Sequence, residues 1–210
     1  MLQLKTDIEH VTLNELITRF EEMLSRNMSE AAWQAFFKTN SFIPSLAFAY
    51  EAVMVQDQAY VGGAGLTGVG AKITDFIFLN PHTGNLALIE IKRPGTPLLS
   101  KYRENLLVPS SDLIAAICQV IDQRYALQRN LDRLKADSEL SRVYGYSIEC
   151  VVIAGSNCAT RRERMAFDLA RHSLRDVVVL TFDELLGKLK GLQKLFAAAT
   201  DKEIDDGSPF

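Results

Sequence analysis

The sequence predicts an α/β protein in which helices flank a mixed β-sheet, and two observations lead to this fold class. Apolar residues recur with helical spacing in several long segments, and they form short, strand-like apolar runs in others. These segments follow one another as helices, a β-meander, a long helix, and then strand, helix, strand and helix. With 210 residues, 48% of them hydrophobic, the chain can bury one sizeable core.

The N-terminal elements are predicted to be helices. Residues 12–24 place apolar side chains at helical spacing, and Ser29 is suited to be the N-cap of a second helix. That second helix contains Trp33, Phe36 and Phe37, which we interpret as core residues rather than as a base-stacking platform.

Strands are predicted next. The β-prone residues 45–57 lead into a glycine-rich segment, residues 62–70. Residues 71–80 and 84–93 are two further strands, and the turn-rich sequence Asn-Pro-His-Thr-Gly between them predicts an antiparallel hairpin. A loop containing three prolines then leads to about residue 110.

The C-terminal half alternates between the two periodicities. Its predicted elements are a helix at 111–135, a strand at 146–155, a helix at 160–173, a strand at 176–182 and a helix at 183–196. We assign residues 1–28 to a helical segment of the same domain as residues 29–200. The polar residues 201–210 are expected to form a disordered tail.

Charge and cysteine content restrict the environment of the protein. The formal net charge of -3 gives no overall attraction to a polyanion, but residues 91–135 hold eight Lys/Arg and four Asp/Glu. The three cysteines are widely separated and form no metal-binding or redox motif. No signal peptide or membrane-length apolar run is present, so we expect a cytoplasmic protein.

The glycine-rich sequence GAGLTG at residues 63–68 matches the letters of the dinucleotide-binding fingerprint. That fingerprint requires a helix after the glycines, whose N-terminus receives the phosphates, and here a predicted strand follows instead. We therefore expect a loop between antiparallel strands, with no nucleotide bound. A nucleotide- or ligand-sensing domain built around this loop is a competing hypothesis, which titration with ATP and NAD would test.

Three charged residues on the predicted hairpin are the best candidates for chemistry. Asp75 lies inside an apolar strand, and Glu90 and Lys92 lie near the end of the next strand. Alternation along a strand points Glu90 and Lys92 to one face, and pairing of the two strands brings Asp75 towards Glu90. Two carboxylates beside one ammonium group would be stabilised by a hard divalent cation such as Mg²⁺.

This arrangement resembles the PD-(D/E)XK nuclease superfamily, which has a restriction-endonuclease-like fold. Thr74 stands where that pattern often has a proline. The surrounding sequence is most similar to the Shedu-type nuclease domain of bacterial anti-phage defence. The matching stretches are SEAAWQAFFKTN, KITDFIFLNPHTGNLALIEIKRPGTPL and DLIAAICQVIDQRYAL.

The resemblance implies a restriction-endonuclease-like core and roles for individual residues. Asp75 and Glu90 would bind Mg²⁺, for which Mn²⁺ can substitute, and the Ile91 carbonyl and Glu30 would complete or support the metal site. Lys92 would orient the attacking water and stabilise the transition state, with Gln119 nearby. The implied activity is hydrolysis of DNA phosphodiesters in defence against phage, by a protein that forms homo-oligomers.

Other readings of the same residues remain open. Glu90 and Lys92 are also compatible with a solvated ion pair on an edge strand, and Glu30 with a residue that complements its helix dipole. Lys72, Arg93, Lys101 and Arg103 are candidate contacts to the nucleic-acid backbone and equally compatible with ordinary surface charge. A nuclease fold that binds nucleic acid or a partner protein without catalysis is the main alternative.

Overall fold

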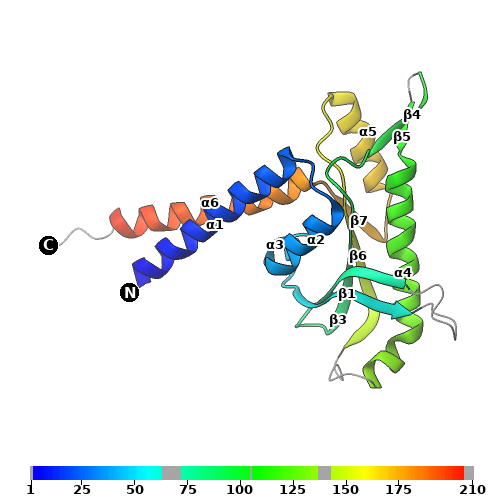
Figure 1. The fold of residues 1–210 in the computed structure, drawn as a ribbon, viewed down its shortest axis with the longest axis horizontal. Helices are drawn as coiled ribbons and strands as arrows, with labels where there is room; N and C mark the ends of the chain where they lie inside the picture. Colours follow the sequence, from blue (N-terminus) through cyan, green and yellow to red (C-terminus); the bar gives the residue numbers. More distant parts are fainter. Residues whose placement is uncertain (1, 63–71, 105, 137–142, 206–210) are drawn as a thin grey trace.

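The computed structural model describes residues 2–62, 72–104, 106–136 and 143–205. The helices and strands follow the predicted order and confirm the α/β fold class, with a mixed five-stranded sheet flanked by helices (Figure 1). The helices are α1 (Leu2–Ser25), α2 (Glu30–Thr39), α3 (Phe42–Ser45), α4 (Ser111–Ala136), α5 (Arg161–His172) and α6 (Phe182–Asp205). The strands are β1 (Val53–Gly62), β2 (Lys72–Leu79), β3 (Asn85–Ile91), β4 (Leu99–Arg103), β5 (Leu106–Pro109), β6 (Tyr144–Ile153) and β7 (Val177–Leu180).

The main sheet has the strand order β1-β2-β3-β6-β7. β1, β2 and β3 form an antiparallel meander, whereas β6 and β7 continue the sheet in parallel with β3. The parallel pairs are connected through α4 and α5, as crossover connections require. The predicted β2–β3 hairpin is confirmed, with Phe76 opposite Ile89 and Leu79 opposite Leu86.

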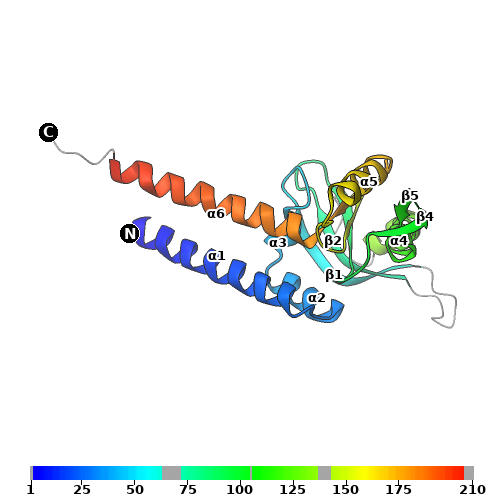
Figure 2. The ribbon, with the colours of Figure 1, turned by 90° about the horizontal axis from the view of Figure 1, so that it is seen from above.

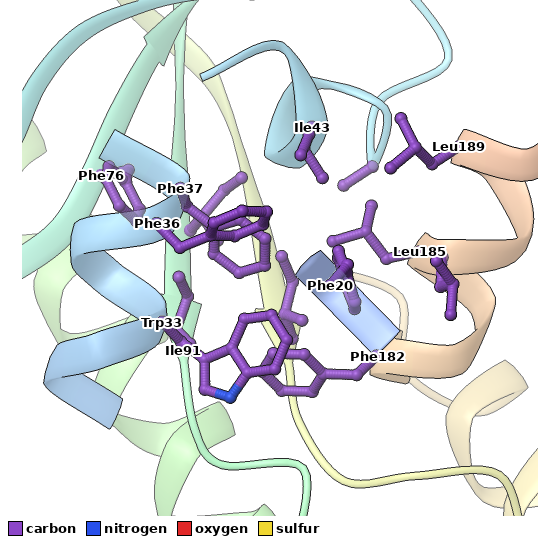
Figure 3. Close-up of a cluster of buried hydrophobic side chains, with 14 of the residues drawn as sticks. Phe20, Trp33, Phe36, Phe37, Ile43, Phe76, Ile91, Phe182, Leu185 and Leu189 are labelled. Carbon is purple, nitrogen blue, oxygen red and sulfur yellow. The ribbon is translucent and has the colours of Figure 1, made fainter. Parts of the chain in front are cut away.

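One face of the sheet is covered by an aromatic core. Helices α1, α2 and α6 meet over it, and their rings interlock (Figure 3). The Trp33 ring lies 4.6 Å from Phe182 and 4.8 Å from Phe20, centroid to centroid, so α2 is fixed against both long helices. Trp33, Phe20, Phe37 and Phe182 are fully buried, which agrees with the assignment of the Trp33 cluster to the core.

The opposite face carries a mostly aliphatic core. Helix α4 packs on β6, β1 and β3, and its Val120 and Leu127 are buried beside Leu88 and Val152 of the sheet. The sequence of α4 repeats buried apolar residues on one side only, which explains why it lies flat against the sheet. The aromatic core thus holds α2, and the aliphatic core holds α4, against opposite faces of β3.

The two long helices at the ends of the chain lie side by side and extend away from the sheet (Figure 2). They run antiparallel, so the N-terminal end of α1 and the C-terminal end of α6 lie at the same end of the molecule (Figure 1). Glu21 and Lys190 form an ion pair between them at 2.5 Å, and Gln193 donates a hydrogen bond to Asn14. No helix among the described residues is long and apolar enough to cross a membrane.

Some predicted elements differ from the structure. Residues 45–52 do not belong to a strand, since β1 begins at Val53 after the short helix α3. The proline-containing loop holds a small two-stranded sheet, β4–β5, which the sequence analysis missed. Helix α6 continues to Asp205, so half of the expected C-terminal tail is helical.

Candidate metal and catalytic site

Asp75 and Glu90 come together at one end of the β2–β3 hairpin. The pairing of β2 with β3 ends at Phe76 and Ile89, and Asp75 and Glu90 are the next residue on each strand. The two strands separate here, and the Asp75 Oδ2 atom accepts a hydrogen bond of 2.7 Å from the Ile91 N–H where a backbone carbonyl would otherwise lie. Asp75 is 9% exposed and Glu90 1%, so both carboxylates lie in the interior.

Lys92 follows β3 and turns its ammonium group towards the same point. Its Nζ atom lies 2.7 Å from Glu90 Oε1 and 3.8 Å from Glu30 Oε1. It also donates a hydrogen bond of 3.2 Å to Gln119 Oε1 on α4. The structure thus brings together the predicted residues Asp75, Glu90, Lys92, Glu30 and Gln119, from β2, β3, α2 and α4.

Local sequence explains why the two helices present these side chains. Helix α2 begins after Ser29, whose side chain accepts a hydrogen bond of 3.3 Å from the Ala32 N–H and so caps the helix as predicted. Capping fixes the first turn, which carries Glu30, and the buried Trp33 one turn later sets the rotation of the helix. In α4, Ser110 caps the first turn through a hydrogen bond of 3.0 Å from the Leu113 N–H.

The sequence analysis missed two glutamines that donate to the carboxylates and a third that donates to one of these glutamines. Gln34 on α2 donates to Asp75 Oδ1 at 2.5 Å, and Gln58 on β1 donates to Gln34 Oε1 at 2.9 Å. Gln123 on α4 donates to Glu90 Oε2 at 3.0 Å and to the Ile73 carbonyl at 2.8 Å. Two of them carry a signal in the sequence, because Gln34 and Gln123 lie one helical turn after the predicted residues Glu30 and Gln119.

Burial makes this cluster of negative charge costly. Burial, the charge of Glu90 and, to a lesser extent, the charge of Glu30 raise the pKa of Asp75 to about 7. Burial also raises the pKa of Glu90, although the hydrogen bond and charge of Lys92 oppose this shift. For Lys92, burial lowers the pKa, but the hydrogen bond to Glu90 and the surrounding carboxylates outweigh it and the net shift is upward. One ammonium group therefore compensates the carboxylates only in part.

The residues present suit a hard divalent cation. Asp75 and Glu90 supply carboxylate oxygens, and the Ile91 carbonyl lies on the same side of β3 as its N–H, which faces Asp75. Mg²⁺ typically takes one or two carboxylates, with water and substrate oxygens completing its shell. Within the described part of the chain, no group of three or more His, Cys, Asp or Glu side chains could hold a metal ion. A cation here would thus rely on two carboxylates, while Glu30 faces Lys92.

One buried polar atom beside the carboxylates has no hydrogen-bond partner among the described residues. It is Gln123 Oε1, on the side chain whose nitrogen donates to Glu90. Buried polar atoms usually find a partner in protein or ordered water. Its presence indicates that this end of the sheet has capacity for ligands beyond the protein's own side chains.

The four candidate phosphate-binding residues do not form one group. Lys72 begins β2 and forms an ion pair of 2.5 Å with Asp122 of α4, the residue before Gln123. Arg93 is exposed and directly follows Lys92. Lys101 and Arg103 are exposed on β4, in the hairpin that projects beyond the N-terminal end of α4 (Figure 1). Lys72 and Arg93 therefore lie within three residues of Asp75 or Glu90 in the sequence, whereas Lys101 and Arg103 belong to a separate hairpin.

The glycine-rich sequence GAGLTG lies outside the described residues. The elements on either side of it are β1, ending at Gly62, and β2, starting at Lys72, and these strands are antiparallel neighbours. The described residues that follow the glycines thus form a strand, as predicted, rather than the helix that a dinucleotide-binding fingerprint requires.

Comparison with known proteins identifies relatives of this chain. Residues 27–186 match the family model described as Shedu protein SduA, C-terminal. The chain is 36% identical over 206 residues to the Shedu protein SduA of Bacillus cereus (strain B4264), in a match that covers 92% of this chain. The match spans about half of that protein, 53% of its length. The matched segment contains Asp75, Glu90 and Lys92, together with the helices that hold them.

Proposed function

This chain belongs to the Shedu SduA C-terminal family, and we propose that it is a metal-dependent nuclease that hydrolyses DNA phosphodiester bonds in defence against bacteriophage. One observation carries the proposal: two buried carboxylates on adjacent strands converge with a lysine at one end of a sheet. We assign the fold to the PD-(D/E)XK nuclease superfamily on the same ground.

The chemistry that a cation adds to such a site is well defined. Mg²⁺ bound to carboxylate oxygens lowers the pKa of a bound water and neutralises charge that develops on a phosphoryl group. The oxygens of Asp75, Glu90 and the Ile91 carbonyl are the ligands that we assign to it. Asp75 and Glu90 lie on two strands of one sheet, so their separation is set by strand pairing rather than by flexible loops.

Lys92 supplies the positive charge of the protein itself. Its ammonium group donates to Glu90 and Gln119, and two acceptors fix the direction of Nζ and leave its third proton for an oxygen of the substrate. In that position it would orient the attacking water and stabilise the negative charge of the transition state. Preorganised groups of this kind commonly contribute about 10²–10³ in rate.

Substrate binding is assigned to the basic residues next to these carboxylates. We propose that Arg93 and Lys72 contact phosphates near the cleaved bond, with Lys101 and Arg103 on the β4 strand contacting the backbone farther along. Phosphate contacts of this type position a nucleic acid without reading its sequence. They also make binding weaken as the salt concentration rises.

The experiment is incubation of the purified protein with linear and circular DNA, and with RNA, in Mg²⁺, in Mn²⁺ and in EDTA. The proposal predicts that DNA is cut with either cation and is left intact in EDTA. Cleavage in EDTA would contradict the metal dependence. DNA binding without cleavage under every condition would instead identify a nuclease fold that has only a binding role.

A further inference from the structure

Two glutamine side chains connect the edge strand β1 to Asp75 through hydrogen bonds. The Gln58 amide donates to Gln34 Oε1, and the Gln34 amide donates to Asp75 Oδ1. The Ile91 N–H donates to Asp75 Oδ2. Each oxygen of the Asp75 carboxylate therefore accepts a hydrogen bond from a different direction, which fixes the plane of the group.

Gln58 determines which way the Gln34 amide points. A glutamine amide has an oxygen that accepts and a nitrogen that donates. Because Gln58 donates to the oxygen of Gln34, the nitrogen of Gln34 is turned towards Asp75, where a donor is needed. Without Gln58, the Gln34 amide loses the contact that favours this orientation over the flipped one.

The backbone of β1 is unusual at this residue. Gln58 lies between Asp57, which pairs with Phe76, and Ala59, which pairs with Thr74, so it stands opposite Asp75. Its φ angle is +43°, in the left-handed region that non-glycine residues rarely adopt, least of all within a strand. Strain of this type persists where surrounding structure holds it, and it is concentrated at functional sites.

The stability of the fold does not account for this arrangement. Gln58 is exposed and Gln34 is half-buried, so their hydrogen bond competes with water and contributes little to folding. The strained backbone at Gln58 works against folding as well. What the chain does provide is a carboxylate held in one orientation at the place where a cation would bind.

We propose that Gln34 and Gln58 are positioning residues for the metal site: Gln34 orients the Asp75 carboxylate, and Gln58 orients Gln34. This inference rests on the proposed function, because it assigns the two glutamines to a divalent cation at Asp75 and Glu90. Neither glutamine contacts the cation. Hydrogen-bond partners of metal ligands typically account for about 10–100-fold in metal affinity.

Two substitutions test the chain of contacts without unfolding the protein. Gln34→Ala removes the donor to Asp75, and Gln58→Gly removes the second amide while relieving the left-handed backbone. Asn27→Gly is the matched control, because Asn27 is the other non-glycine residue with a left-handed φ angle (+46°) in the described part of the chain. Gln56→Ala removes an exposed glutamine from the same strand as a second control.

The readout is calorimetric binding of Mg²⁺ and Mn²⁺ to the DNA-free protein, with thermal melts in EDTA. We expect both test variants to bind the cations about 10-fold or more weakly than the parent, and both controls to bind them equally well. We also expect Gln58→Gly to melt in EDTA at or above the parental temperature. A more stable protein that holds the metal less well has lost a positioning group, whereas a structural residue would lower the melting temperature.

The possible results distinguish failure of the positioning role from failure of the metal site itself. If the parent binds the cations and the two test variants bind them as tightly, the positioning role is overturned and the nuclease proposal is untouched. If the parent binds neither cation, the metal site itself is overturned, and with it the role of the glutamines. Weaker binding by Asn27→Gly to the same extent would also contradict a specific role for Gln58.

Discussion

Helices α2 and α4 lie on opposite faces of the same sheet, and each presents two polar residues one turn apart to the same pair of strands. From α2, Glu30 faces Lys92 and Gln34 donates to Asp75; from α4, Gln119 accepts from Lys92 and Gln123 donates to Glu90. The helices differ in the burial of the second polar residue. Gln123 is 2% exposed, whereas Gln34 is half-buried; the first residues, Gln119 and Glu30, are both open to solvent.

This difference divides the site into two halves. The Glu90 half is closed, since Glu90 is 1% exposed and its carboxylate is held by Lys92 and by the buried Gln123. The Asp75 half is more open, and its donors come from a partly exposed helix and an exposed edge strand. A cation and its water would therefore approach from the α2 side, and the α4 side would act as the rigid wall.

The largest effect is expected from removal of the charge on the closed side. Glu90→Gln preserves shape but takes away an anionic ligand and the partner of Lys92. We expect the increase in melting temperature caused by Mg²⁺ to disappear and DNA cleavage to fall by about 10²–10³ or more. The control is Glu149→Gln, on β6 opposite Ala87, which should alter neither quantity. A Glu90→Gln protein that retains the Mg²⁺-dependent increase would contradict our choice of ligands.

The free energy of unfolding should depend more on Gln123, in the closed half of the site, than on Gln34, in the more open half. Gln123→Ala leaves a buried carboxylate and the Ile73 carbonyl without their donor, and we expect the free energy of unfolding to fall by about 1–3 kcal/mol. Gln34→Ala removes a donor from the more open half, where water can replace it, and should cost under about 1 kcal/mol. Urea unfolding of both variants in EDTA measures the difference. Equal losses would show that the two halves are equally enclosed.

The pH dependence of stability sharpens the comparison further. The pKa of Asp75 is about 7 in the folded protein, above the ordinary range of an aspartate, so the folded state holds this proton more tightly than the unfolded state. The protonated Asp75 carboxyl group therefore stabilises the folded state at low pH, and this stabilisation is lost as the pH rises towards and through 7. In EDTA, Asp75→Asn should therefore have a higher melting temperature than the parent at about pH 8.5. The difference between the two melting temperatures should shrink towards about pH 5.

A surface carboxylate provides the control for that experiment. Asp57→Asn removes an ion pair of 2.9 Å with the exposed Lys38, and it should change the melting temperature little at either pH. At about pH 8.5, saturating Mg²⁺ should make the parent melt at the higher temperature, because the parent binds the cation and Asp75→Asn does not. A difference in melting temperature between Asp75→Asn and the parent that does not change with pH would show that Asp75 is ionised at little cost in the folded protein.

Much of this fold follows from local patterns in the sequence. The N-cap at Ser29 was sufficient to predict α2, and the turn-rich sequence between β2 and β3 was sufficient to predict their hairpin. The apolar spacing of residues in α4 predicted that helix. Alternation along the strands and the pairing of the hairpin also predicted that Asp75, Glu90 and Lys92 converge. These features depend on neighbours within a few residues or across one short turn.

The features that were missed depend on contacts distant in the sequence. Three prolines in residues 94–109 favour a loop, and the β4–β5 pairing appears only when the chain folds back on itself. Helix α6 extends past its last strongly apolar residues, with α1 as its neighbour in the fold. Gln34 and Gln123 lie one helical turn after the predicted residues Glu30 and Gln119, but their roles as donors depend on Asp75 and Glu90 lying opposite them in the fold.

The most direct test of the account is a DNA-cleavage time course at saturating Mg²⁺ for the parent and for Lys92→Ala. Lys92 is held by Glu90 and Gln119 without being a metal ligand, so its loss should leave Mg²⁺ binding intact while removing a charge needed in the transition state. We predict cleavage about 10²–10³ slower than in the parent, with the Mg²⁺-dependent increase in melting temperature preserved. A Lys92→Ala protein that cuts DNA at the parental rate would contradict the account.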